Sequence, residues 1–287
     1  MPRNKRVALI TDTTCDIPRD IVKQYGILMV PQYVIWRSEE YNDLTEIDAA
    51  TFYHRLPRDS EHPKTSRPTV PDYLNCIDQA IQDGAEEAVV IVVSEQLSGS
   101  VASGRLAQQE SRIPFHLEDA KSVSMGLGWQ VLAAARVRDQ GGGVEEMLEA
   151  ARAVRKHLRA IFTVNTLEYL HRGGRIGGAA KWVGTALDLK PSLYVDHESG
   201  TIQPGERIRT RKKALNAIYD KFFEGYERGQ RMRVAVAHGA CLEEAEGLLN
   251  RIQAEWNPVD LILTHASPAI GVHGGPGILG LCGYVEG

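Results

Sequence analysis

Residues 88–100, AVVIVVSEQLSGS, decide the fold class of this chain. The run from Ala88 to Val93 is almost entirely β-branched, which is typical of a strand buried on both faces. Small and hydroxyl residues follow at Ser94–Ser100 and lead into a helical pattern that extends to Glu110. A buried strand followed directly by a helix indicates an α/β protein with a mostly parallel sheet.

The same alternation continues in both directions along the chain. It predicts strands at Val7–Thr11, Leu28–Trp36, His116–Ala120, Ile161–Val164, Val234–Ala237 and Leu261–Thr264. It predicts helices at Pro18–Gly26, Thr45–Leu56, Pro71–Gly84, Trp129–Arg138, Glu145–Leu158, Thr166–His171, Lys212–Tyr226 and Glu243–Glu255. Residues Pro57–Pro71 contain four prolines and are therefore expected to form a loop.

The pattern changes near residue 160. A Gly- and Arg-rich stretch follows, and Pro191–Asp196 is expected to pair with Thr201–Pro204 as a hairpin. We therefore predict two α/β domains. The N-terminal domain, 1–160, has a mostly parallel sheet with flanking helices, and the C-terminal domain, 161–287, is a mixed α/β sandwich.

Composition excludes several classes of protein. The 287 residues include 33 Lys and Arg against 37 Asp and Glu, so the chain lacks the overall positive charge of a nucleic-acid-binding protein. No stretch approaches the ~18 apolar residues of a membrane span, although transient contact with a membrane surface stays open. The cysteines lie far apart and indicate reduced thiols in a cytoplasmic protein without a zinc site: Cys15, Cys76, Cys241 and Cys282.

Four segments are expected at the carboxyl ends of strands, where open α/β sheets bind their ligands. They are rich in hydroxyl residues, glycine and proline, and comprise Thr11–Asp16, His62–Thr69, Ser94–Ser100 and Ala266–Gly277. Such segments present hydroxyl and backbone N–H donors without strong charge. We therefore expect them to converge on a small polar or anionic group.

Each candidate donor also has a purely structural interpretation. Ser98 could simply cap the helix that follows it. Alternatively, its hydroxyl could hold a carboxylate together with the backbone N–H groups that follow, beginning at Gly99. Thr65 and Ser66 are not needed for capping and remain free for a ligand. His273 is expected in a tight turn that brings its ring and backbone N–H groups to the ligand, or it is a structural turn histidine.

Several familiar motifs are absent or incomplete. Gly275, Gly277 and Gly280 spell a dinucleotide-binding pattern, but the chain ends too soon for the helix and strand that this pattern requires. No serine has the flanking glycines of a nucleophile elbow, and the chain has no phosphate-binding P-loop. A divalent ion could bind to three carboxylates, those of Asp12, Asp16 and Asp43, but their spacing does not demand one. We therefore expect no metal and no cofactor.

A basic cluster follows the predicted boundary. Arg172 and Arg175 flank glycines, and Arg207–Lys213 is a dense run of positive charge. Such a run is usually a solvated face, but in a net acidic chain it could also attract a phosphate or an acidic partner. Nucleic acid is not expected as the partner, because no aromatic residues are interleaved with the run.

Seven motifs in order resemble the DegV family, whose members include the fatty-acid-binding component of bacterial fatty acid kinase. They are ITDTTCDIP, KTSRPT, VSEQLSGSVASG, SVSMGLG, LEYLHRGGRIG, RIRTRKKAL and GVHGGPG, and they span almost the whole chain. The resemblance implies two α/β domains with a long-chain fatty acid, such as palmitate, stearate or oleate, in a buried tunnel between them. The chain departs from the family at Arg67, where Gln is usual, and at Gly274, where Thr is common.

The resemblance also implies roles for particular residues. The fatty acid carboxylate would contact Thr65, Ser66 and Ser98, with His273 and the backbone at Gly99 and Gly275 nearby. Arg175 and Arg209 would face a kinase subunit that phosphorylates the carboxylate. The chain would then be a carrier rather than an enzyme. The alternatives are a phosphotransferase or hydrolase acting on a small anion in the same cleft, and a nucleic-acid-binding regulator that uses Arg207–Lys213.

Overall fold

The computed structural model describes residues 6–183 and 189–286. Within them lie strands β1 Val7–Asp12, β2 Leu28–Val30, β3 Tyr33–Trp36, β4 Glu39–Asn42, β5 Lys64–Ser66, β6 Glu87–Val92, β7 Phe115–Asp119, β8 Arg159–Thr163, β9 Ser192–Asp196, β10 Thr201–Pro204, β11 Met232–His238, β12 Asp260–His265 and β13 Leu279–Val285. The helices are α1 Arg19–Tyr25, α2 Ala49–Arg55, α3 Val70–Gln82, α4 Ser100–Glu110, α5 Met125–Asp139, α6 Val144–His157, α7 Glu168–Arg172, α8 Arg211–Phe223, α9 Leu242–Trp256 and α10 Pro268–Gly274, with 3-10 helices η1 Thr13–Cys15 and η2 Gly177–Trp182.

The first sheet is parallel throughout and has the strand order β2-β1-β6-β7. Its strands therefore end at one common edge, where η1 follows β1 and the Ser94–Ser100 segment follows β6. Central strand β6 is buried along almost its whole length. This arrangement confirms the parallel sheet predicted from residues 88–100.

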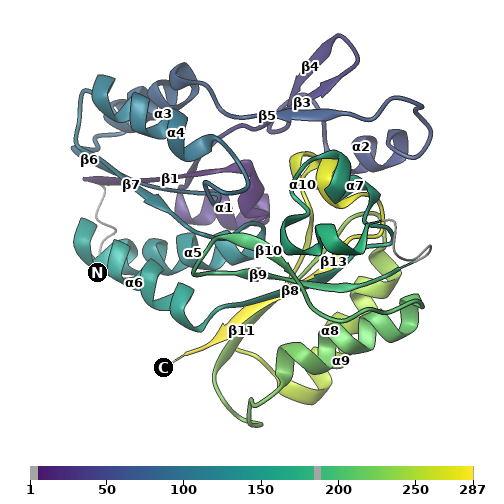
Figure 1. Ribbon diagram of the computed structural model, residues 1–287. Helices are drawn as coiled ribbons and strands as arrows, with labels where there is room; N and C mark the ends of the chain where they lie inside the picture. Colours follow the sequence, from purple (N-terminus) through teal and green to yellow (C-terminus); the bar gives the residue numbers. More distant parts are fainter. Residues whose placement is uncertain (1–5, 184–188, 287) are drawn as a thin grey trace.

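Alternate residues of the first sheet pack into different layers. Leu9, Val89 and Ile91 contact α5 and α6 on one face, whereas Ile10 and Val90 pack with α3 and α4 on the other. Figure 1 shows these two helical layers on opposite sides of β1, β6 and β7. Both faces are apolar, which explains why β6 has no alternation of polar and apolar residues.

The second sheet is mixed and has the order β10-β9-β8-β13-β11-β12. Only β11 and β12 are parallel, and the other pairs are antiparallel. Helices α8 and α9 cover its outer face, and α5 and α6 lie between it and the first sheet (Figure 1). The two sheets with their helices confirm the α/β architecture. The boundary at residue 160 stays a prediction, because α5 packs against both sheets.

Strand β13 was missed by the sequence analysis, although it lies near the centre of the second sheet. Its sequence, LGLCGYV, contains two glycines and no alternation of polar and apolar residues. Gly283 packs so closely on β11 that a Cβ atom there would lie 2.3 Å from the carbonyl oxygen of Arg233. The glycines therefore allow the backbone of β13 to pack closely on its neighbours. By strand propensity alone, the same glycines indicate a break in the strand.

Three further local expectations were wrong. The extended run Leu28–Trp36 divides at residues 31–32 into β2 and β3, which belong to different sheets. The expected loop Pro57–Pro71 contains β5, which pairs with β3 in a small antiparallel sheet. The helix expected from Thr45 begins only at Ala49, after the N-cap Asp48, whose carboxylate accepts a hydrogen bond from the Thr51 N–H at 2.7 Å.

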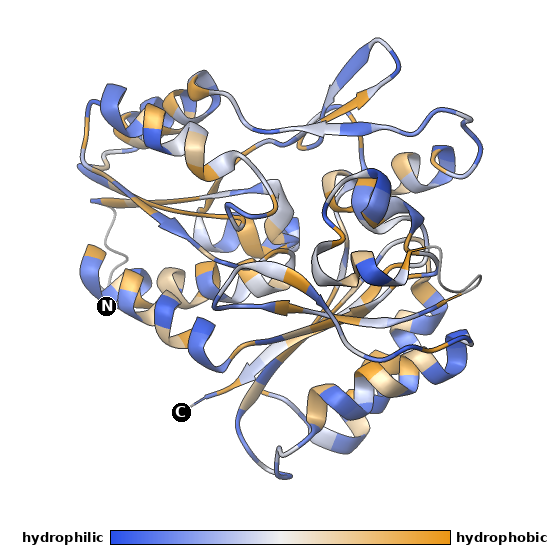
Figure 2. Cartoon of the chain, viewed as in Figure 1, coloured by the Kyte–Doolittle hydropathy of each residue, from blue (hydrophilic) through white to orange (hydrophobic). Residues whose placement is uncertain are grey.

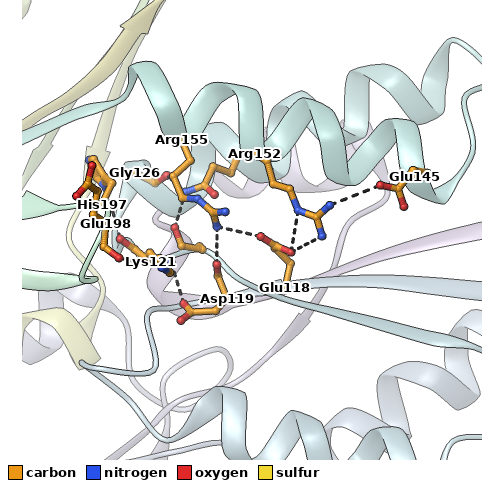
Figure 3. Close-up of polar contacts among 11 residues, drawn as sticks. Glu118, Asp119, Lys121, Gly126, Glu145, Arg152, Arg155, His197 and Glu198 are labelled. Carbon is orange, nitrogen blue, oxygen red and sulfur yellow. Dashed lines mark hydrogen bonds and ion pairs between the residues drawn. The ribbon is translucent and has the colours of Figure 1, made fainter.

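The β9–β10 turn joins the second sheet to the first. Lys121 Nζ donates to the carbonyl of Glu198 at 2.8 Å, and Ser94 Oγ donates to the carbonyl of Gly200 at 2.8 Å. Gly200 has φ +74°, and a Cβ atom there would lie 2.3 Å from Ser94 Oγ. Figure 3 shows Lys121 and Glu198 near the ion pairs from α6 to Glu118. Figure 2 shows largely apolar strands beneath helices with one polar face.

Candidate ligand-binding cavity

A cavity of about 380 Å³ lies where the edge of the first sheet meets the face of the second. Its volume falls within the range of ~300–1,000 Å³ that is typical of ligand pockets. Each of the four segments singled out in the sequence contributes to its wall, as do β5, β8 to β11, β13 and the α7 region. The expected convergence of these segments is therefore present in the structure.

Most of the cavity wall is apolar. Small residues of the second sheet form one side of it, among them Ala160, Ala237, Gly280 and Cys282. Larger apolar side chains complete the wall: Val93, Leu97, Val123, Ile161, Phe162, Leu170, Val195, Ile202, Ile270 and Ile278. Because small side chains on a sheet leave room above it, this region can accommodate an apolar ligand of considerable length.

The other end of the cavity is polar. Thr65, Ser66, Ser98, Gly99 and His273 all line it, although they come from three distant parts of the sequence. All five were expected near one ligand group, and all five line this cavity. Gly275, the sixth predicted residue, does not line the cavity. It ends α10 with φ +72° and packs against the ring of Tyr169.

Ser98 belongs to a short chain of hydrogen-bonded hydroxyl groups. Its Oγ lies 2.9 Å from Ser100 Oγ, which in turn accepts a hydrogen bond from Gln32 Nε2 at 2.8 Å. Ser98 Oγ also accepts from the Ser100 N–H at 3.3 Å. The N-cap of α4 is Gly99 and not Ser98, because α4 begins only at Ser100. The Ser98 hydroxyl is thus close to the helix terminus and faces the cavity.

Thr65 and His273 form the second polar pair. Thr65 Oγ1 lies 2.9 Å from His273 Nε2, and His273 Nδ1 is buried without a partner among the described residues. Burial lowers the pKa of His273 to about 3, and the nearby positive charge of Arg175 acts in the same direction. A Cβ atom on Gly173 would lie 2.0 Å from Nδ1, so only glycine there accommodates the ring. His273 is therefore a neutral hydrogen-bonding group at neutral pH.

The segment around His273 is a helix and not the tight turn that we expected. Ser267 is its N-cap, and Pro268, with its fixed φ, begins α10. Gly274 stands where the resemblance implies threonine, and a Cβ atom there would lie 2.4 Å from Ile278 Cδ1. The missing side chain lets Ile278 pack closely against α10.

Four polar lining residues were not named as site residues from the sequence: Thr14, Gln32, Arg67 and Ser124. Thr14 and Arg67 lie inside segments that were singled out, and Ser124 lies in the motif SVSMGLG. Gln32 had no detectable signal in the sequence, because it lies between β2 and β3, inside the run Leu28–Trp36 that was expected to be one strand. Ser124 has φ +55° and donates from Oγ to Asp16 Oδ2 at 2.5 Å.

Asp16 lies behind Ser124 and connects the two sheets. Its Oδ1 accepts from the Ser267 N–H at 2.9 Å, and its carbonyl accepts from Thr264 Oγ1 at 2.7 Å. Burial raises the pKa of Asp16 to about 7 and that of Asp43 to about 7. Within residues 6–183 and 189–286, no cluster of three or more His, Cys, Asp or Glu side chains is arranged to hold a metal ion.

The two arginines expected to face a partner occupy different environments. Arg175 lines the cavity and is half-buried, with Nε donating to the carbonyl of Leu97 at 2.9 Å and Nη1 to that of Gly173 at 2.6 Å. Arg209 is exposed, shortly before α8. The structure therefore places Arg175 in the cavity wall and Arg209 at the surface.

In the part of the chain that the structure describes, no helix is long and apolar enough to cross a membrane. This agrees with the absence of a long apolar stretch in the sequence.

Comparison with known proteins identifies the family. A family model described as "Uncharacterised protein, DegV family" matches residues 6–286. A DegV domain-containing protein of Clostridium perfringens is 35% identical over 279 residues, which cover 96% of this chain and 98% of that protein.

Two solved structures show the same fold. The DegV family protein of Thermus thermophilus, described for its fatty acid binding, has a TM-score of 0.90 and 31% identity, covering 98% of this chain and 100% of that one. DegV of Bacillus subtilis, described as a fatty acid binding protein, also has a TM-score of 0.90 and 31% identity, covering 98% and 99% of the two chains. By sequence, motif order and fold, this chain belongs to the DegV family.

Proposed function

We propose that this protein binds a long-chain fatty acid in the cavity between the two sheets and presents its carboxylate to a fatty acid kinase. The observation that carries this proposal is a cavity whose wall is mostly apolar and also includes the hydroxyl residues Thr65, Ser66 and Ser98. Its relatives from Thermus thermophilus and Bacillus subtilis are described as fatty-acid-binding. Native mass spectrometry of the purified protein tests it, since a carrier retains lipid and an enzyme for a small anion does not.

The apolar wall accounts for most of the binding energy. Burial of a methylene group contributes ~0.8 kcal/mol, so a C16 chain offers about 11 kcal/mol of gross transfer free energy. Part of this is lost when the ligand is immobilised. A carrier of this kind therefore needs an apolar cavity more than a strongly charged headgroup site.

The polar end suits a carboxylate that must still react. Hydroxyl groups of Thr65, Ser66 and Ser98 can donate to its oxygens, and His273, being neutral, adds a hydrogen bond without a fixed charge. Hydrogen bonds to a charged group contribute ~1.5–3 kcal/mol each. Neutral donors leave a carboxylate oxygen nucleophilic enough to attack the terminal phosphoryl group of a nucleotide. The oxygen–phosphorus bond to the nucleoside diphosphate then breaks, and an acyl phosphate forms.

Replacement of Ser98 by Ala is expected to weaken fatty acid binding about tenfold, because one donor to the carboxylate is lost. The free energy of unfolding should change by only ~1 kcal/mol, since Ser98 Oγ is not the N-cap of α4 and its hydrogen bonds within the protein, both to Ser100, are one of 2.9 Å and one of 3.3 Å. Titration of delipidated protein with palmitate measures the effect. Ser111→Ala, at the other end of α4 and outside the lining, is the matched control. Unchanged affinity in both Ser98→Ala and Ser66→Ala would place the carboxylate elsewhere.

Replacement of Arg209 by Ala is expected to leave palmitate affinity unchanged within about twofold, because this exposed side chain lies outside the cavity lining. Phosphorylation of the bound acid by a cognate kinase should fall about tenfold or more, since exposed charges govern encounter and orientation of partners. A coupled kinase assay measures this fall, and added salt should reproduce it in the unsubstituted protein. Lys23→Ala, exposed on α1, is the control. Normal kinase turnover with Arg209→Ala would remove this residue from the partner surface.

Arg175→Ala distinguishes two roles of the other arginine. If Arg175 serves only the kinase, this variant behaves like Arg209→Ala. If it contacts the headgroup, as its place in the cavity wall allows, palmitate affinity falls as well.

A further inference from the structure

Two histidines meet at the carboxyl ends of the parallel strands β11 and β12. His238 is the last residue of β11 and His265 the last residue of β12, and the pairing of the strands sets them opposite each other. Their ring centroids lie 4.4 Å apart, and the ring planes are tilted by 54°. Neither histidine lines the cavity, so the fatty acid site does not account for their proximity.

The histidines lie on the face of the second sheet that α8 and α9 cover, because successive residues of a strand point to opposite faces. Ala237 and Ala266, which adjoin the two histidines in the chain, line the cavity. Val236 and Leu263, which lie two residues before them, pack instead with the apolar side chains of α8 and α9. The imidazole pair is therefore separated from the cavity by the sheet itself.

His238 is buried without a partner. Its side chain belongs to a residue that is 1% exposed, and neither Nδ1 nor Nε2 has a hydrogen-bond partner among the described residues. On the other side of β11, the residue that pairs with His238 is Leu279, which has no polar side-chain atom. Proteins rarely leave buried polar atoms unpaired, since each costs free energy. The unpaired nitrogens of His238 thus point to a ligand.

The imidazole of His238 keeps a free lone pair at neutral pH. Burial lowers its pKa to about 4, and the neighbouring His265 acts in the same direction. Polar side chains at the starts of α8 and α9 already have partners, since Arg211 pairs with Glu244 at 2.7 Å and Cys241 Sγ donates to a backbone carbonyl at 3.4 Å. His265 is therefore the side chain that is placed to act together with His238.

We propose that His238 and His265 bind a divalent transition-metal ion of the zinc, nickel or copper class. Two ring nitrogens at ~2.0–2.1 Å from one ion lie about 3 Å apart, a separation within reach of rings on adjacent strands ~4.8 Å apart. Because His265 is exposed, its ring can turn toward the ion, and the ion can enter from solvent. Neutral imidazole suits these metals, whereas Mg²⁺ and Ca²⁺ prefer oxygen ligands.

The site has two protein ligands, and water completes the coordination. No group of three His, Cys, Asp or Glu side chains in residues 6–183 and 189–286 is arranged around one ion. We therefore expect weaker binding than at a structural zinc site with four protein ligands. The bound ion connects the ends of β11 and β12. This inference is independent of the proposed function, so either can fail without the other.

Calorimetric titration of the untagged protein with NiCl₂ tests the proposal. The unsubstituted protein is expected to bind one Ni²⁺ per chain, Zn²⁺ should compete with it, and MgCl₂ should not. His265→Gln should weaken Ni²⁺ binding at least about tenfold, since even the loss of a group that only orients a ligand costs ~10–100-fold in metal affinity. His157→Gln removes an isolated exposed histidine on α6 and is the matched control. Its Ni²⁺ affinity should stay within about twofold.

His238→Leu distinguishes a metal ligand from a histidine that only fills space. Leucine needs no hydrogen-bond partner, so the metal-free variant should be at least as stable to urea as the unsubstituted protein. Added Ni²⁺ should raise the urea midpoint of the unsubstituted protein and not that of the variant. Unchanged Ni²⁺ affinity in both His238→Leu and His265→Gln would place the ion elsewhere and overturn the proposal. Absence of Ni²⁺ and Zn²⁺ binding to the unsubstituted protein would overturn it as well.

Discussion

Replacement of Ala237 by Phe is expected to weaken fatty acid binding by more than 100-fold. Ala237 lies on β11 and lines the apolar part of the cavity, so a phenyl ring there occupies the space of the acyl chain. Exclusion of only four methylene groups costs about 3 kcal/mol, which corresponds to about 100-fold in affinity. Titration of the delipidated variant with palmitate measures the loss.

The fold should survive this substitution because the ring enters an existing cavity, although overpacking costs ~1–3 kcal/mol. Ala160→Leu, a smaller enlargement on β8 in the same wall, provides a second variant. Ala254→Phe adds the same ring on the exposed face of α9 and is the control. If both cavity variants fold and bind palmitate as the unsubstituted protein does, the acyl chain does not lie on this face of the second sheet.

Replacement of Asp16 by Asn is expected to change the pH dependence of stability. In the folded state, burial raises the pKa of Asp16 from 3.8 to about 7, so the folded protein holds a proton that the unfolded chain releases. The unsubstituted protein therefore loses stability as the pH rises from about 4 to about 7. The asparagine variant does not titrate at this position. As the pH rises over this range, the free energy of unfolding of Asp16→Asn should therefore increase relative to that of the unsubstituted protein, by up to about 4 kcal/mol.

Urea unfolding at several pH values between 4 and 8 measures this difference. Asn can still accept from the Ser267 N–H, so the contact between the two sheets is retained in the variant. Asp220→Asn, on the exposed side of α8, makes none of these contacts and controls for the loss of one carboxylate. If the free energies of unfolding of Asp16→Asn and the unsubstituted protein differed by the same amount at every pH, Asp16 would be ionised throughout this range.

The local elements could be predicted from the sequence because neighbouring residues determine them. The run Ala88–Val93 forms a buried strand, and α1 ends at Gly26 in the left-handed conformation that glycine favours. The cap of α3 is a reciprocal pair, in which Thr69 and Asp72 each bond the other's backbone N–H. Thr11–Asp16 and Ser94–Ser100 follow neighbouring strands β1 and β6 of one parallel sheet, so their convergence was also predictable. The approach of His62–Thr69, which contains β5, and of Ala266–Gly277, which follows β12 of the second sheet, depends on tertiary packing.

The composition of the cavity was not predictable, because it depends on contacts between residues far apart in the sequence. Strand β13 inserts between β8 and β11, and this pairing brings Gly280 and Cys282 to the cavity wall. Asp16 accepts from the Ser267 N–H across 251 positions of sequence. Neither contact leaves a periodic pattern in the sequence.

The two arginines of the cavity also show what the sequence could predict and what it could not. In the sequence, Arg67 was a basic residue in a proline-rich segment, and Arg175 was part of a basic cluster assigned to a partner surface. Only the folded chain brings both to the polar end of one cavity, Arg67 across Gly99 and Arg175 on the carbonyls of Leu97 and Gly173. Sequence by itself determined most of the helices, the strands with continuous apolar runs and the donor types, since these depend on local backbone preferences. Strands β5 and β13 were not determined in this way, because they depend on pairing with distant strands. The tertiary structure alone decided which charges line the cavity, because that depends on packing between distant segments.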